Sequence, residues 1–153
     1  MISSGLLYIL LKRCYYFFMY RKGVSALIVN KSNEFLLVNL TSFKEMYFAI
    51  LGGGIDGDES LEECVYREIR EEIGIEKESF ELVGASKESL KVKFKLNKDG
   101  KEYEGSERYF FGFNFIGSDN QIRLKDDEVR SYVWVPFSKL KEYLLFEIGR
   151  AHV

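Results

Sequence analysis

Apolar residues recur every four positions between residues 58 and 73, and this spacing predicts an amphipathic helix. The stripe consists of Leu61, Val65, Ile69 and Ile73. Asp58 is the expected N-cap, because its carboxylate can accept hydrogen bonds from the free N–H groups of the first turn. Gly74 follows the last apolar position, where glycine commonly ends a helix.

Elsewhere the chain shows short runs of β-branched and aromatic residues that are typical of strands. These runs are 23–30, 34–40 and 47–51 before the helix, and 80–86, 89–96, 108–115 and 129–135 after it. Residues 97–100, NKDG, predict a turn. A closing helix is expected over 138–148, after the proline that ends the last strand. One helix between two groups of strands predicts an α+β fold, a mixed sheet covered by helices.

Residues 1–22 form an apolar N-terminal extension, ahead of a domain predicted over 23–153. Lys12 and Arg13 interrupt the apolar run, so its parts are shorter than the roughly 20 residues that a membrane-spanning helix needs. A signal peptide carries its positive charges before the apolar run, and here they follow it. We expect no membrane insertion, and a segment that packs on the domain or forms a homodimer. A native start at Met19 is the alternative.

Composition narrows the class of protein further. The chain has 153 residues, 46% of them hydrophobic, which suits one folded domain. Its net charge of −2 argues neither for nor against nucleic acid. Two cysteines without a C-x-x-C motif predict no disulfide framework or zinc site, and favour a reducing, cytoplasmic location. The only histidine is the penultimate residue, which argues against a histidine-dependent triad.

Acidic residues are concentrated between residues 56 and 72, where eight of them and two arginines give a local charge of −6. Glu68, Glu71 and Glu72 are three and four residues apart, so a helix places their carboxylates on one face. Each such like-charged pair costs about 0.2–0.5 kcal/mol. A solvated acidic face and a site for a hard cation such as Mg²⁺, which prefers oxygen ligands, both fit this spacing.

The surroundings of the glutamates favour the second interpretation. Residues 53–75, GGIDGDESLEECVYREIREEIGI, match the pattern G-x5-E-x7-R-E-U-x-E-E-x-G-U at every defined position, where U is apolar. This is the Nudix box, and the chain resembles the Nudix hydrolase family. The similarity in layout covers about 23–146, and residues 128–140 resemble the family's C-terminal strand, tryptophan and helix. The resemblance implies a Nudix-like α/β/α sandwich, with the box helix packed on the mixed sheet.

The resemblance also implies a reaction, the hydrolysis of a nucleoside diphosphate linked to another group X by activated water, with Mg²⁺ or Mn²⁺. It places the metal ligands at Glu68, Glu71, Glu72 and the Gly52 carbonyl. Glu68 is also the candidate general base. Arg67 would orient the cluster through charge-assisted hydrogen bonds. Glu59 would steady the loop or hold an outer metal.

Many family members add a carboxylate from a late loop. Glu128 fits this layout best, and the alternatives are Asp126, Asp127 and Glu107. The substrate candidates are residues that approach, stack on or neutralise a nucleotide: Gly52, Gly53, Tyr47, Phe48, Tyr109, Lys44 and Arg108. The substrate itself stays open between a free nucleotide, a dinucleotide, a sugar conjugate and capped RNA.

Two other classes compete with the hydrolase. A non-catalytic nucleotide-binding regulator on the same fold usually loses box glutamates, and this chain keeps them. A diphosphate isomerase needs a catalytic cysteine that the sequence does not place.

Two departures from common family patterns concern residues 48–54, FAILGGG. Leu51 stands where many members have proline, and the tryptophan–proline contexts typical of diadenosine-polyphosphate and RNA pyrophosphohydrolases are missing.

Overall fold

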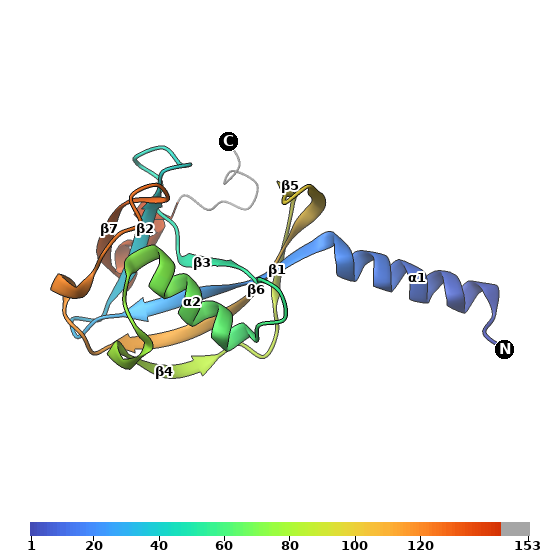
Figure 1. Cartoon of the computed structure of the whole chain (residues 1–153), viewed down its shortest axis with the longest axis horizontal. Helices are drawn as coiled ribbons and strands as arrows, with labels where there is room; N and C mark the ends of the chain where they lie inside the picture. The colour runs from blue at the N-terminus through green and yellow to red at the C-terminus, as the bar shows by residue number, and fades with distance from the viewer. Residues whose placement is uncertain (145–153) are drawn as a thin grey trace.

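The computed structural model describes residues 1–144, apart from the side chains of residues 12–19. Its helices are α1 (Ser4–Met19), α2 (Leu61–Ile73) and α3 (Leu140–Tyr143), with short 3₁₀ turns at Lys77–Ser79, Asp119–Gln121 and Phe137–Lys139. Its strands are β1 (Tyr20–Val29), β2 (Glu34–Leu40), β3 (Leu51–Gly54), β4 (Phe80–Ala85), β5 (Leu90–Lys98), β6 (Lys101–Phe115) and β7 (Val129–Pro136). Figure 1 shows α2 lying across the sheet.

The strands form one mixed sheet in the order β4-β6-β1-β2-β7, with β3 paired to β1 and β5 paired to β6. β1 and β6 are parallel, and the other pairs are antiparallel. The predicted α+β class, with the box helix packed on a mixed sheet, is confirmed. β6 begins seven residues before the predicted 108–115 run, because its first half pairs with β5 in a hairpin. The turn predicted there is confirmed, and both Asp99 and Gly100 have positive φ.

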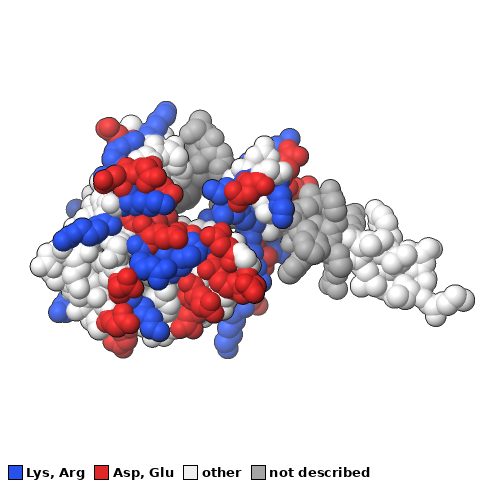
Figure 2. Space-filling view, in the orientation of Figure 1, with Lys and Arg blue, Asp and Glu red and all other residues white. Residues whose placement is uncertain are grey.

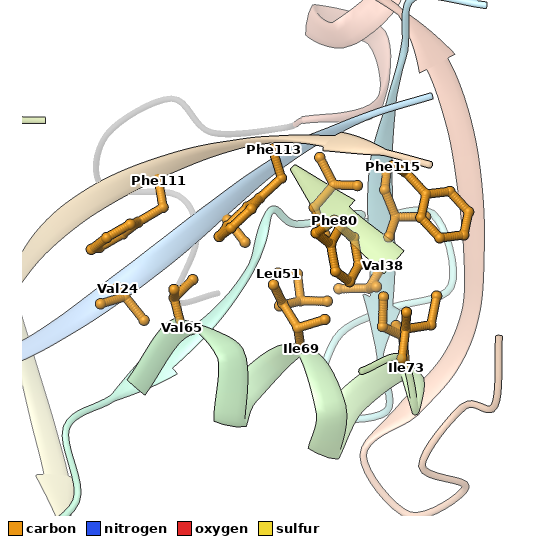
Figure 3. Packing of buried hydrophobic residues seen from close by; sticks show 14 of the residues in the cluster. Val24, Val38, Leu51, Val65, Ile69, Ile73, Phe80, Phe111, Phe113 and Phe115 are labelled. Carbon is orange, nitrogen blue, oxygen red and sulfur yellow. The ribbon is translucent and has the colours of Figure 1, made fainter. Parts of the chain in front are cut away.

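The box helix packs on the sheet through its predicted apolar stripe. Val65, Ile69 and Ile73 are fully buried, and Figure 3 shows them pointing toward aromatic side chains of β4 and β6. The N-cap prediction is wrong: Ser60, not Asp58, accepts a hydrogen bond from the Glu63 N–H at 3.1 Å. The box loop continues two residues further than predicted, because hydrogen bonds between residues 56 and 59 hold it. The predicted end is confirmed, since the residue after Ile73 has φ 70°.

The third strand lies further along the chain than predicted. Residues 47–50 touch the sheet through a single bridge, between Val38 and Ala49, and β3 consists of Leu51 and three glycines. These glycines pair with β1 because they bring no side chain between the strands; a Cβ on Gly52 would overlap the Val24 carbonyl. The strand predicted over 47–51 is therefore wrong, and the glycine run itself forms the strand that reaches the box helix.

The two ends of the chain differ from the expectations in different ways. β1 begins at Tyr20, three residues before the predicted strand, and α1 precedes it and points away from the sheet (Figure 1). Residues 6–11 of α1 are exposed, so this part does not pack on the domain. Within the described part of the chain, no helix is long and apolar enough to cross a membrane. The predicted helix 138–148 is confirmed only in part: its start is a 3₁₀ turn, α3 ends at Tyr143 with an extended Leu144 after it, and residues 145–148 lie outside the described residues.

Candidate active site

Arg67, at the middle of α2, lies among the acidic residues of the box. Its guanidinium contacts Glu59 at 2.7 Å, Glu68 at 2.9 Å and Glu71 at 3.1 Å, and it also donates to the Gly54 carbonyl at 2.9 Å. Charge-assisted hydrogen bonds of this kind are strong and directional. The arginine therefore fixes the positions of three carboxylates relative to β3, as its predicted orienting role requires.

Glu59 ties the box loop to the helix. Its carboxylate accepts two hydrogen bonds from the Arg67 guanidinium edge and one from the Asp56 N–H at 2.9 Å. The bond to Arg67 lowers the pKa of Glu59 to about 2, and the same bond raises the pKa of Arg67. The Glu59 carboxylate is therefore ionised at neutral pH and hydrogen-bonded through both oxygens, which suits the supporting role predicted for it.

Glu68 lies directly over the glycine strand. A Cβ on Gly53 would overlap the Glu68 carboxylate, so only glycine at this position lets the side chain lie there. Burial raises the pKa of Glu68, and the neighbouring Arg67 partly offsets this. A carboxylate that resists ionisation, next to a backbone that a ligand can approach, has the properties of a general base.

Glu72 is the least satisfied carboxylate of the cluster. The residue is 7% exposed, and its Oε2 is buried without a hydrogen-bond partner in the described structure. Burial raises its pKa to about 8, and the charges of Glu68 and Glu128 add to the shift. An unpartnered carboxylate in a buried site is unfavourable when ionised, unless a cation neutralises it.

The carboxylates supply the oxygen ligands that a hard metal ion prefers, but their present arrangement does not form a set of metal ligands. Among the side chains that the structure describes, no three His, Cys, Asp or Glu residues are arranged as a metal site. Arg67 Nη1 donates to the carboxylates of both Glu68 and Glu71, so each of them has this arginine as a partner. The Glu71 side chain is 44% exposed and free to exchange this contact for an ion. The unpartnered oxygen of Glu72 supplies the second argument for a cation at this place.

The late loop brings Glu128 toward the cluster. Its carboxylate pairs with Lys125 at 2.9 Å and is half-exposed, while its charge contributes to the raised pKa of Glu72. Glu107, the alternative on β6, instead accepts hydrogen bonds from Ser89 at 2.8 Å and from the Tyr109 hydroxyl at 3.1 Å. The geometry therefore favours Glu128 as the additional carboxylate.

The predicted substrate residues are divided between the sheet and a loop. Arg108 donates to the Val24 and Gly53 carbonyls at 2.8 and 3.0 Å, so it supports the glycine strand from the sheet. Burial lowers its pKa. Tyr109 lies under the Lys22 ammonium at 5.3 Å. Tyr47 and Phe48 belong to the loop after β2, where Phe48 packs edge-on against the Tyr143 ring at 5.7 Å.

This loop depends on two residues that sequence reasoning missed. Asn39 is 1% exposed and donates to the Lys44 and Tyr47 carbonyls, at 3.1 and 2.6 Å. Arg130 donates to the Asn39 side-chain oxygen at 2.6 Å. Backbone and hydroxyl bonds from Thr41 reach the carbonyls of residues 127 and 128. In the sequence, the signal is a lone asparagine within an apolar strand. Together these hydrogen bonds link the loop of Tyr47 and Phe48, the aromatic loop, to the loop of Glu128.

The buried thiol of Cys64 does not suit catalysis. It donates to the Gly54 carbonyl at 3.5 Å, and burial raises its pKa to about 12. A nucleophilic or acid–base cysteine needs a lowered pKa and access to solvent. This thiol therefore gives no support to the isomerase alternative.

Comparison with known proteins agrees with the geometry. The NUDIX domain family matches residues 19–152. An RNA pyrophosphohydrolase of Gluconacetobacter diazotrophicus is 31% identical over 137 residues, which is 80% of this chain and 81% of that protein. A MutT protein of Methanosarcina mazei Go1 is 28% identical with a TM-score of 0.55, covering 86% of each chain. A C. elegans Ap4A hydrolase, 17% identical, shares the fold with a TM-score of 0.64 over 83% of this chain and 88% of its own. The complete box, its helix on a mixed sheet and these matches lead to one conclusion, that this chain belongs to the NUDIX family of hydrolases.

Proposed function

We propose that this Nudix hydrolase is a metal-dependent pyrophosphohydrolase that cleaves a nucleoside diphosphate linked to a group X. The observation that carries the proposal is the buried Glu72 carboxylate, which has an oxygen without a partner and lies beside Glu68. Burying such a group is unfavourable for folding alone. A divalent cation bound beside the Glu72 carboxylate would offset the unfavourable free energy of burying it.

Glu68, Glu71, Glu72 and the Gly52 carbonyl would hold Mg²⁺ or Mn²⁺. When bound, the ion neutralises phosphate charge and lowers the pKa of a bound water. Glu68 accepts the proton of the attacking water, which its raised pKa favours. The ion pair of Arg67 and Glu59 holds the box loop against the helix, and Glu128 adds negative charge from the loop before β7.

We further propose that the substrate is of the nucleotide type, with the 5′ end of RNA as the first candidate. The support is the relative named RNA pyrophosphohydrolase, which this chain matches over 80% of its length. Capped RNA, free nucleotides and dinucleotides are the alternative substrates.

The cytoplasm remains the predicted location. A homodimer formed through residues 1–18 remains the predicted assembly.

The test is release of phosphate or pyrophosphate from nucleoside triphosphates, dinucleoside polyphosphates and 5′-triphosphorylated RNA, with Mg²⁺, Mn²⁺ or EDTA. We expect turnover only with metal, and a loss of at least 100-fold in Glu68→Gln. Glu62→Gln is the matched control, because Glu62 is an exposed glutamate of the same helix. Tight nucleotide binding without turnover would favour the regulator instead.

A further inference from the structure

The first part of α1 is a helix of apolar residues that the domain does not cover. Residues 6–11 are four leucines, a tyrosine and an isoleucine, and each of them is between 42% and 64% exposed. Ser3 caps this helix, because its side chain accepts a hydrogen bond from the Leu6 N–H at 3.2 Å. Figure 2 shows the free end of α1 as a surface without charged side chains, in contrast to the domain. A surface of this composition is unfavourable in water.

Residues 6–11 leave no polar side on the helix. Successive residues of an α-helix are about 100° apart, so six consecutive residues cover its whole circumference. A sheet, or a second copy of α1, would contact one side of the helix and leave the others in water. Helices that are apolar on every side are found in large protein cores or in membranes. The hydrocarbon of a membrane is the partner that can surround this helix.

The length of the apolar part fits one leaflet of a bilayer. Residues 4–11 rise by about 12 Å along the helix axis. This is less than half of the hydrocarbon core, which is about 30 Å thick. The expectation of no membrane insertion follows from the length that spanning requires, and a helix that enters one leaflet needs no such length. Tyr15 and Tyr16 come soon afterwards in the sequence, and tyrosine is enriched at the level of the lipid headgroups.

The distribution of charge favours an anionic lipid surface. Residues 1–33 contain five basic and no acidic residues, and the first two basic residues, Lys12 and Arg13, directly follow the apolar part. Because the whole chain has a net charge of −2, the remainder carries −7. Basic residues next to an inserted segment are attracted to anionic lipids, and an acidic domain is repelled by them. Charge therefore directs the N-terminal end of the molecule toward such a membrane.

We propose that α1 is a membrane anchor, in which residues 6–11 enter the hydrocarbon of one leaflet and the basic residues after them select anionic lipid. The NUDIX domain is then held at the membrane surface through the junction of α1 and β1 at Tyr20. The cytoplasmic leaflet, which is anionic, agrees with the predicted location. This inference goes beyond the proposed function and does not depend on it, because it concerns the place of the hydrolase and not its reaction.

Vesicle flotation tests the anchor. The full chain is diluted from detergent into vesicles of phosphatidylcholine, with or without phosphatidylglycerol, and the partition coefficient is measured. We expect the wild-type chain to float, with a coefficient at least fivefold higher for the anionic vesicles. Ile9→Glu should lower the coefficient at least tenfold, because a charge is costly in hydrocarbon. Val83→Glu should not, and it is the matched control because Val83 is also exposed and apolar but lies on β4, away from α1 (Figure 1).

The double replacement of Lys12 and Arg13 by glutamine should lower the preference for anionic vesicles at least threefold. All variants should melt at the wild-type temperature, because residues 6–11 lie outside the packed domain. A wild-type chain that floats with neither kind of vesicle, or Ile9→Glu that floats as well as wild type, would overturn the anchor. A dimer in light scattering that does not float would assign α1 to dimerisation instead. Equal binding to the two kinds of vesicle would overturn the selection of anionic lipid.

Discussion

The replacement Glu72→Gln tests whether the site contains a carboxylate that folding alone does not favour. The pKa of Glu72 is raised from 4.5 to about 8 in the folded chain, chiefly by burial. Between these two values the native state keeps a proton that the unfolded chain has lost. Its contribution to stability is complete below about pH 4.5 and is lost as the pH rises through about 8.

The magnitude follows from the difference between the two pKa values. At about 1.4 kcal/mol for each pH unit, the wild-type free energy of unfolding should fall by up to roughly 5 kcal/mol through this group. Glutamine does not titrate, so Glu72→Gln should avoid that fall. An amide placed there without partners costs about 1–3 kcal/mol at every pH. The variant should therefore be no more stable than wild type at pH 5, and more stable at pH 9.

The assay is urea unfolding in EDTA at pH 5, 7 and 9, where the quantity of interest is the difference between variant and wild type. Glu71→Gln is the control, because it removes one carboxylate from the same cluster and leaves the buried, unpartnered oxygen of Glu72 in place. Added Mg²⁺ at pH 9 should stabilise wild type and not Glu72→Gln, and the variant should lose most activity. A Glu72→Gln difference that is the same at all three pH values would refute the reasoning.

Three further changes test other parts of the site. Arg67→Lys keeps the charge but loses the two-pronged contact with Glu59, so kcat should fall at least tenfold in steady-state assays; an unchanged kcat would contradict the orienting role. Arg130→Ala should raise KM at least fivefold with a smaller effect on kcat, because losing its bond to Asn39 frees the aromatic loop. Arg123→Ala should not raise KM, because the Arg123 side chain bonds to nearby carbonyls, those of residues 120 and 122. A chain that starts at Met19 should keep its activity and melting temperature, and a loss of either would show that residues 1–18 are structural.

The box helix could be predicted from sequence because its information is local. Apolar and acidic positions repeat with the helical period, so the stripe of Val65 and Ile69 and the glutamate face follow from spacing alone. The glycine strand could not, since glycines carry no hydrophobic pattern. Its pairing with β1 depends on close approach of two backbones that are distant in the chain.

The burial of Glu72 could not be predicted from the sequence of the helix either. The late loop covers this end of α2, where Lys125 donates its backbone N–H to the Glu72 carbonyl at 3.2 Å and Arg123 donates to the Ile73 carbonyl at 2.8 Å. Nothing in the helix predicts that contact. Asn39 was missed for the same reason, because its partners lie on a loop and on a neighbouring strand.

The glutamates of one motif consequently differ in their readiness to ionise. Arg67 lowers the pKa of Glu59 to about 2, while burial raises the pKa of Glu68 and brings that of Glu72 to about 8. A metal ligand must be deprotonated, so an ion that binds below pH 8 has to displace the proton of Glu72. Metal affinity should therefore rise with pH up to about 8 and level off above it. Nucleotide phosphates, which supply further ligands to Mg²⁺, should strengthen the binding. Thermal shifts with Mg²⁺ and a non-hydrolysable nucleotide together should exceed the sum of the separate shifts, and strictly additive shifts would show that metal and substrate do not share one site.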